Sequence, residues 1–160
     1  MDIRAEQPQD TTAIGEVVTA AFGQADEARL VEEIRADGDI AASLVAVLDG
    51  KVIGHVLLSK MQAPFSAMAL APLAVHPAYQ GQRVGGTLMR TAIARARLLD
   101  AEAIFVQGDP AYYSRFGFKV EAASGFTSPY AGPHLMVLVM GGALPVSEGE
   151  ISHAPAFSRL

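Results

Sequence analysis

A glycine-punctuated segment, Gln80-Gly81-Gln82-Arg83-Val84-Gly85-Gly86-Thr87, separates a short apolar run from a helical pattern. The apolar run, Leu70 to Val75, ends at His76-Pro77, because proline lacks an N–H donor and disfavours helix in the residue before it. Apolar residues recur at helical spacing from Val84 onward. A strand, a glycine-rich turn and a helix N-terminus expose free backbone N–H groups and the positive end of the helix dipole. These residues therefore predict a binding site for an anion such as a phosphate.

A second segment, Gly108-Asp109-Pro110-Ala111-Tyr112-Tyr113-Ser114-Arg115-Phe116-Gly117-Phe118, has the chemistry of a short, well-capped helix. Asp109 is a favourable N-cap, Pro110 suits the first helical position, and Gly117 can end the helix in a left-handed conformation. The helix would present two tyrosines and an arginine before the chain turns abruptly into a strand.

The remaining patterns predict the elements that position these two segments. Apolar residues at helical spacing predict helices over residues 8–22 and 26–35, and Asp49-Gly50 predicts a hairpin turn. Pro72 interrupts the run that leads into the glycine-rich segment. It therefore predicts a bulge or a splayed edge, with backbone groups free for a ligand. Strands are predicted over residues 2–5, 43–48, 51–60, 66–75, 103–107 and 134–140.

Composition narrows the class of protein. A chain of 160 residues with 51% hydrophobic and 18% charged residues fits a single packed domain over residues 1–140. Residues 141–160 read as a C-terminal extension that packs on this domain or trails from it. A net charge of −5 gives no basic footprint for nucleic acid. No leader or membrane-length apolar run is visible, so we expect a cytoplasmic protein without a membrane partner. The histidines and acidic residues show no metal-ligand spacing, and no metal is expected.

The two segments together resemble the motifs of the GNAT superfamily of acyl-CoA-dependent N-acyltransferases. The family loop, Gln/Arg-x-x-Gly-x-Gly/Ala, is matched at Gln80 and Gly85, whereas Arg83 stands where the family usually has glycine. An arginine there would be strained if the loop required a positive φ. Tyr113 is similar in position to the tyrosine that the family uses as a general acid. The tyrosine segment also resembles a poorly characterised bacterial branch of N-acetyltransferases.

The resemblance implies an α/β fold with a mixed, mostly antiparallel central sheet, splayed in the middle and covered by helices on both faces. It implies an N-acetyltransferase that moves acetyl from acetyl-CoA directly to a primary amine, with Tyr113 protonating the departing CoA thiolate. A phenol of pKa near 10 and a thiol near 8.5 make that transfer feasible. One backbone N–H of the splayed strand would stabilise the developing oxyanion. The cofactor-binding residues implied are Leu73, Ala74, Val75, Gln80, Gly81, Gln82, Arg83, Val84, Gly85, Gly86 and Thr87.

The acceptor and its base stay open. The acceptor amine belongs either to a small molecule or to a protein or peptide, and a homodimer is compatible with the resemblance. A lysine-like amine is almost fully protonated at pH 7, so a side chain or a water relay must remove a proton. Candidate bases are Glu32, Glu33, His55 and His76. The alternative function is a non-catalytic acyl-CoA-binding sensor or interaction module on the same fold.

Overall fold

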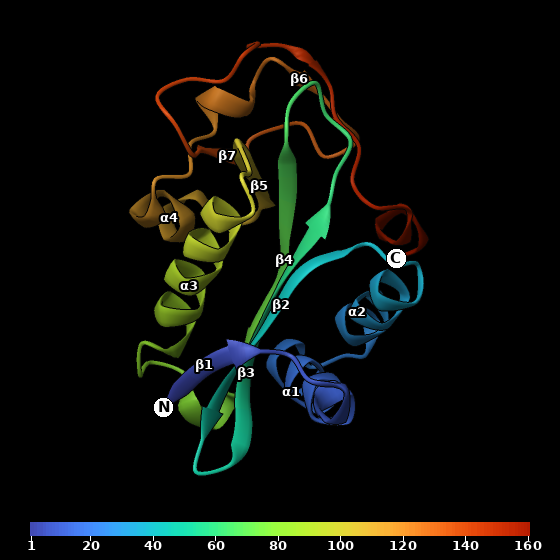
Figure 1. The fold of residues 1–160 in the computed structure, drawn as a ribbon, viewed down its shortest axis with the longest axis vertical. Helices are drawn as coiled ribbons and strands as arrows, with labels where there is room; N and C mark the ends of the chain where they lie inside the picture. Colours follow the sequence, from blue (N-terminus) through green and yellow to red (C-terminus); the bar gives the residue numbers. More distant parts are fainter.

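The computed structural model describes all residues from 1 to 160 and centres on one six-stranded sheet in the order β1-β2-β3-β4-β5-β7 (Figure 1). All neighbouring strands are antiparallel except β4 and β5, which are parallel. A small parallel pair, β6-β8, lies apart from it. The mixed, mostly antiparallel sheet predicted from the sequence is confirmed. The strands are β1 (Asp2–Ala5), β2 (Ile40–Leu48), β3 (Lys51–Lys60), β4 (Ala67–Val75), β5 (Ala103–Gln107), β6 (Phe126–Thr127), β7 (Leu135–Val139) and β8 (Gly149–Glu150).

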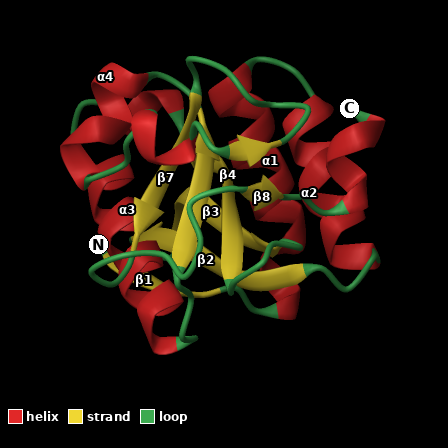
Figure 2. Ribbon diagram, turned by 90° about the horizontal axis from the view of Figure 1, so that it is seen from above, coloured by secondary structure: helices red, strands yellow, loops and turns green.

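Helices cover both faces of the sheet, as Figures 1 and 2 show. On one face, α1 and α2 bury apolar stripes against β2, β3 and β4, with Val18 and Ile34 fully buried. On the other face, α3 buries Leu88, Met89 and Ala92. The predicted helical stripes are therefore confirmed. The helices are α1 (Thr11–Phe22), α2 (Asp26–Ala36), α3 (Val84–Leu98) and the short α4 (Pro110–Tyr113). None of them combines the length and the hydrophobicity needed to cross a membrane.

The sheet opens between β4 and β5. These strands pair only where residues 67–69 meet residues 103–105, although both continue beyond that point. On its other side, β4 shifts register against β3 between Val56 and Leu58, opposite Ala71 and Pro72. Since proline cannot donate a ladder hydrogen bond, the predicted bulge and splay are confirmed at Pro72. The backbone after this point is free to meet a ligand.

Two boundaries differ from those predicted by more than one residue. Strand β2 begins at Ile40, three residues before the predicted start at Ser43, because Ile40 and Ala42 pair with Ser59 and Leu58 of β3. The alanine-rich start of β2 carries little strand preference, so its partner strand decides its conformation. The predicted helix from Pro8 begins as a 3-10 turn, and the α-helix itself starts at Thr11.

The segment after Met140 returns to the body of the protein. Ile151 and Ala156 are buried, and the backbone of Ser152 bonds that of Gln62 in both directions. Arg159 then forms ion pairs with Glu33 (2.7 Å) and Asp37 (2.6 Å). Figure 1 shows the C-terminus beside α2. The C-terminal segment therefore spans the molecule from the end of the sheet to α2.

Candidate functional site

A cavity of about 690 Å³ lies at the N-terminus of α3, between β4 and α4. Gln80 fixes the loop at its entrance, because its Nε2 donates to the Val75 carbonyl oxygen of β4 at 3.0 Å. The cavity is lined by most of the predicted cofactor-binding residues, namely Leu73, Val75, Gln80, Gly81, Arg83, Val84, Gly85 and Gly86.

Three predicted residues do not line this cavity. Ala74 packs into the core beneath α1 and α2, and Gln82 is exposed on the loop. The Thr87 hydroxyl donates to the Arg83 carbonyl oxygen at 2.9 Å, which secures the first turn of α3.

The cavity floor offers unpaired backbone donors. The N–H groups of Val84, Gly85 and Gly86 make no hydrogen bond within the protein, and the first bond of the helix is Thr87 N–H to Arg83 C=O. A Cβ at Gly85 would lie 3.2 Å from the Tyr112 hydroxyl. Glycine thus keeps the first turn open to a ligand, where free N–H groups and the helix dipole favour an anion.

Three arginines add positive charge to this cavity, and no carboxylate lines it. They are Arg83, Arg90 and Arg115, and none of them forms an ion pair within the protein. Arg115 lies over the Tyr112 ring at 4.5 Å and Arg90 over the Phe116 ring at 5.5 Å. Stacking holds the guanidinium groups in place while their charge stays uncompensated. In a protein of net charge −5, this is a local site for a polyanion.

Tyr113 lines a different cavity, of about 350 Å³, and Leu73 lines both cavities. Asp109 caps α4 by accepting from the Ala111 N–H at 2.9 Å, and Gly117 ends the following turn at φ +97, as predicted. The Tyr113 ring packs edge-on against Tyr112 (5.0 Å) and Phe118 (5.9 Å). Burial, with a smaller contribution from Tyr112, raises the pKa of Tyr113, so its hydroxyl keeps its proton at neutral pH.

Gly108 explains how the Tyr113 ring fits against β5. A Cβ at position 108 would lie 2.5 Å from the ring, which is closer than packed carbon atoms approach. His134 holds the same loop, since its Nδ1 lies 3.2 Å from the Gly108 carbonyl oxygen. The end of β5 therefore sets the position of the tyrosine.

None of the four candidate bases lines either cavity. Glu32 is exposed, and Glu33 pairs with Arg159. His76 caps the turn after β4, where its Nδ1 accepts from the Ala78 N–H at 3.1 Å. His55 is fully buried in β3.

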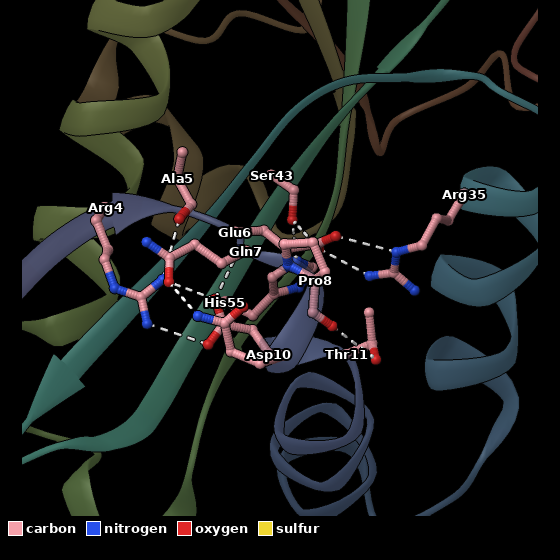
Figure 3. Close-up of polar contacts among 11 residues, drawn as sticks. Arg4, Ala5, Glu6, Gln7, Pro8, Asp10, Thr11, Arg35, Ser43 and His55 are labelled. Atoms are coloured by element: carbon pink, nitrogen blue, oxygen red, sulfur yellow. Dashed lines mark hydrogen bonds and ion pairs between the residues drawn. The ribbon is translucent and has the colours of Figure 1, made fainter.

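His55 belongs to a buried polar cluster beneath α1 and α2 (Figure 3). Its Nε2 lies 2.9 Å from the Ser43 hydroxyl, which donates to the Glu6 carboxylate at 2.6 Å. Arg35 donates twice to the same carboxylate, at 2.7 and 3.0 Å. The cluster ties β1, β2, β3 and α2 together, and this gives His55 a structural role.

Comparison with known proteins identifies the family. The protein-family model described as "Acetyltransferase (GNAT) family" matches residues 10–118. The chain belongs to the GNAT family. It is 42% identical over 133 residues to the uncharacterised N-acetyltransferase YjhQ of Escherichia coli (strain K12), covering 78% of this chain and 73% of YjhQ.

Two solved GNAT structures show the same fold over nearly the whole chain. Escherichia coli YhbS, solved in complex with CoA, is 32% identical, with a TM-score of 0.92 over 99% of this chain and 92% of YhbS. A GNAT acetyltransferase from Brucella melitensis, solved in complex with acetyl-CoA, is 34% identical, with a TM-score of 0.83 over 98% and 97% of the two chains. The fold class predicted from the sequence is confirmed.

Several cavity residues lie outside the GNAT motifs. Among them are Tyr79 and Arg90 in the first cavity and Glu27, Tyr130 and His153 in the second. The position of Arg90 could have been predicted from the sequence. It follows Gly86 by four residues, so the two lie on the same side of α3, which faces the loop. The residues of the second cavity come from segments that no local pattern connects.

The replacement of the usual GNAT loop glycine has a measurable cost. Arg83 adopts φ +67 and ψ +13, the left-handed conformation that favours glycine. We expect Arg83→Gly to exceed Arg83→Ala in free energy of unfolding by about 1 kcal/mol, because both lose the guanidinium and only alanine keeps a strained Cβ. Urea denaturation of the two variants measures the difference. Equal stabilities would mean that the loop relaxes around any side chain.

The buried cluster predicts a loss of stability in acid. Burial lowers the pKa of His55 to about 4, from an ordinary 6.5, while Glu6 opposes that shift and Arg35 adds to it. Between these values the unfolded chain binds a proton that the folded chain does not. The free energy of unfolding therefore decreases as the pH is lowered from 6.5 to 4, by up to about 1.4 kcal/mol per pH unit.

The lowered pKa of Glu6 also makes the free energy of unfolding decrease as the pH is lowered. Burial opposes its ionisation, but hydrogen bonds from Arg35 and Ser43 outweigh burial and lower its pKa. The midpoint of urea unfolding, measured from pH 7 to 4.5, should change less with pH in His55→Gln than in the wild type. Identical slopes would place the acid sensitivity elsewhere.

Proposed function

We propose that the protein is an N-acetyltransferase that transfers the acetyl group of acetyl-CoA to a primary amine by direct attack, with Tyr113 as the general acid. The observation that carries this proposal is that two unlike cavities share Leu73 as a lining residue. One holds unpaired backbone N–H groups and three arginines, and the other holds a protonated, half-buried tyrosine. The CoA and acetyl-CoA complexes of the two similar structures support the same cofactor here.

The first cavity matches the chemistry of the cofactor. Its pyrophosphate would accept from the N–H groups of Val84, Gly85 and Gly86, with Arg83, Arg90 and Arg115 balancing the phosphate charges. The pantetheine arm would follow β4 through the splay, where the strand lacks pairing to β5 after Ala69. That route leads past Leu73 and brings the thioester to the cavity that contains Tyr113.

The transfer is balanced without any covalent enzyme intermediate. The nitrogen of the neutral amine forms a bond to the acetyl carbonyl carbon, and the carbon–sulfur bond then breaks. The Tyr113 hydroxyl gives its proton to the departing thiolate and becomes a phenolate. The proton that the nitrogen loses as the amide forms then returns through solvent to this phenolate. Backbone N–H groups freed by the bulge at Pro72 are the donors available to the oxyanion.

Calorimetric titration with acetyl-CoA, CoA and ATP tests the cofactor. We expect acetyl-CoA and CoA to bind with similar affinity and ATP to bind far more weakly, because ATP lacks the pantetheine arm that would follow β4. Release of free thiol in the presence of amines then tests the transfer. Binding without turnover on any amine would favour the non-catalytic acyl-CoA sensor, and no binding would remove the function altogether.

A further inference from the structure

The two cavities that share Leu73 are lined by side chains of opposite charge. The only formally charged side chain that lines the second cavity is Glu27, whereas the first is lined by three arginines. Gln24 donates to the Glu27 carboxylate at 3.1 and 3.2 Å, and no basic side chain pairs with it. A carboxylate that is not neutralised attracts cations, most strongly where the surroundings exclude water. The second cavity therefore favours an ammonium group.

Most of the remaining lining of this cavity is apolar, although it also includes Gln107 and His153. Its walls are formed mainly by aromatic and aliphatic side chains, among them Phe22, Leu30, Leu70, Phe105, Tyr130 and Phe157. Burial of hydrocarbon against such walls gains about 25 cal/mol per Å². A second charge buried against these walls would lose its hydration without a partner of its own. The lining thus selects a molecule whose body, beyond the amine, is apolar.

His153 contributes an uncharged wall. Its imidazole packs edge-on against Tyr130 (4.9 Å) and Phe157 (5.1 Å), and its Nδ1 is buried without a hydrogen-bond partner. Burial lowers the pKa of His153 to about 4, so the ring carries no charge at neutral pH. No positively charged side chain in this cavity then opposes an ammonium group, and Glu27 is its only charged side chain.

The position of the walls limits the size of the occupant. The corner between α1 and α2 supplies Phe22, Glu27 and Leu30, the splayed strands supply a second wall, and the C-terminal segment supplies His153 and Phe157. Arg159 fixes that segment on α2 through Glu33 and Asp37. A volume of about 350 Å³ lies at the small end of ligand sites. These dimensions fit a small molecule better than the surface of a folded protein.

We propose that this cavity is the acceptor site and that it takes a small primary amine with an aromatic or hydrocarbon body, its ammonium group held by Glu27. The assignment rests on the acetyl transfer proposed above. Glu27 is a specificity-determining residue here, because it selects and orients the amine. It takes no part in the proton transfers of the reaction. The amine loses its proton to solvent before it attacks the acetyl group.

A panel of acceptors tests the substrate class at saturating acetyl-CoA. The probes are 2-phenylethylamine, 1,4-diaminobutane, ethanolamine and a lysine-containing peptide, with release of free thiol as the readout. We expect kcat/KM for 2-phenylethylamine to exceed that for each of the others at least tenfold. Preference for the diamine or the peptide would overturn the proposal while leaving the acetyl transfer intact.

A matched pair of variants tests Glu27. Glu27→Gln should raise the KM for 2-phenylethylamine about tenfold and leave the KM for acetyl-CoA unchanged, because one charge-assisted contact is lost. Glu16→Gln, which changes an exposed carboxylate on the neighbouring helix α1, should change neither value. A KM for the amine that Glu27→Gln leaves unchanged would overturn the role of this carboxylate.

Calorimetry with the CoA-saturated protein separates the two proposals. Binding of 2-phenylethylamine that Glu27→Gln weakens, without turnover, would support the acceptor cavity and remove the transfer function. Absence of both binding and turnover for 2-phenylethylamine would overturn the cavity assignment itself. Acetyl-CoA binding, measured in parallel, reports on the first cavity alone.

Discussion

Tyr113→Phe should lower kcat about 100-fold and leave the affinity for acetyl-CoA nearly unchanged. General acid catalysis contributes roughly 10²- to 10⁴-fold, and the variant removes only the proton donor. The ring contacts with Tyr112 and Phe118 persist in phenylalanine, so the fold and the cavity walls are preserved. Thiol release at saturating substrates gives kcat, and calorimetry gives the affinity.

The neighbouring tyrosine supplies the control. Tyr112 lines the first cavity, beside Gly85 and under the Arg115 guanidinium. We expect Tyr112→Phe to retain most of kcat, because its hydroxyl lies beside Gly85 in the first cavity and Tyr112 does not line the second. An unchanged kcat in Tyr113→Phe would remove this residue from the mechanism. Equal losses in both variants would point to a shared packing effect instead of proton transfer.

The sequence predicted the parts of the fold that depend on local physics. Helical spacing located the stripes of α1 and α2, and Asp49-Gly50 located the hairpin, where both residues adopt positive φ. Cap chemistry located α4, and the proline at position 72 located the bulge of β4. Each of these signals lies within a few residues, so no tertiary contact was needed to detect it.

The second cavity could not be predicted from such local signals. Glu27, Phe105 and His153 are far apart in sequence and meet only because β5 lies beside β4 and the C-terminal segment returns to α2. Residues 141–160 show no periodicity, and their path is set by backbone bonds at Gln62 and by the ion pairs of Arg159. Long-range pairing of this kind leaves no local pattern to read.

The candidate bases show the same limit. The strand that carries His55 is buried on both faces, so alternation could not reveal which face the ring occupies. The structure places the ring on a network with Ser43 and Glu6, away from both cavities. A histidine in a strand is equally consistent with catalysis and with a satisfied core position until its partners are known.

Gly85→Glu should abolish measurable binding of acetyl-CoA, with a loss of affinity of at least 100-fold. A side chain there meets the Tyr112 hydroxyl at 3.2 Å and a Val75 methyl at 3.6 Å, so it must project into the cavity. Its carboxylate would compete with the pyrophosphate for the free N–H groups and for the arginines that line the site. Steric exclusion and charge repulsion act in the same direction.

Gly15→Glu is the matched control, because Gly15 is also helical and a Cβ there would meet no atom within 4 Å. It adds the same charge to the protein, on α1 and away from the cavity, so long-range repulsion of the cofactor appears in both variants. Calorimetry should show near-normal binding for Gly15→Glu and none for Gly85→Glu. Because the two variants differ only in place, retained binding in Gly85→Glu would mean that the pyrophosphate lies outside the loop at the start of α3.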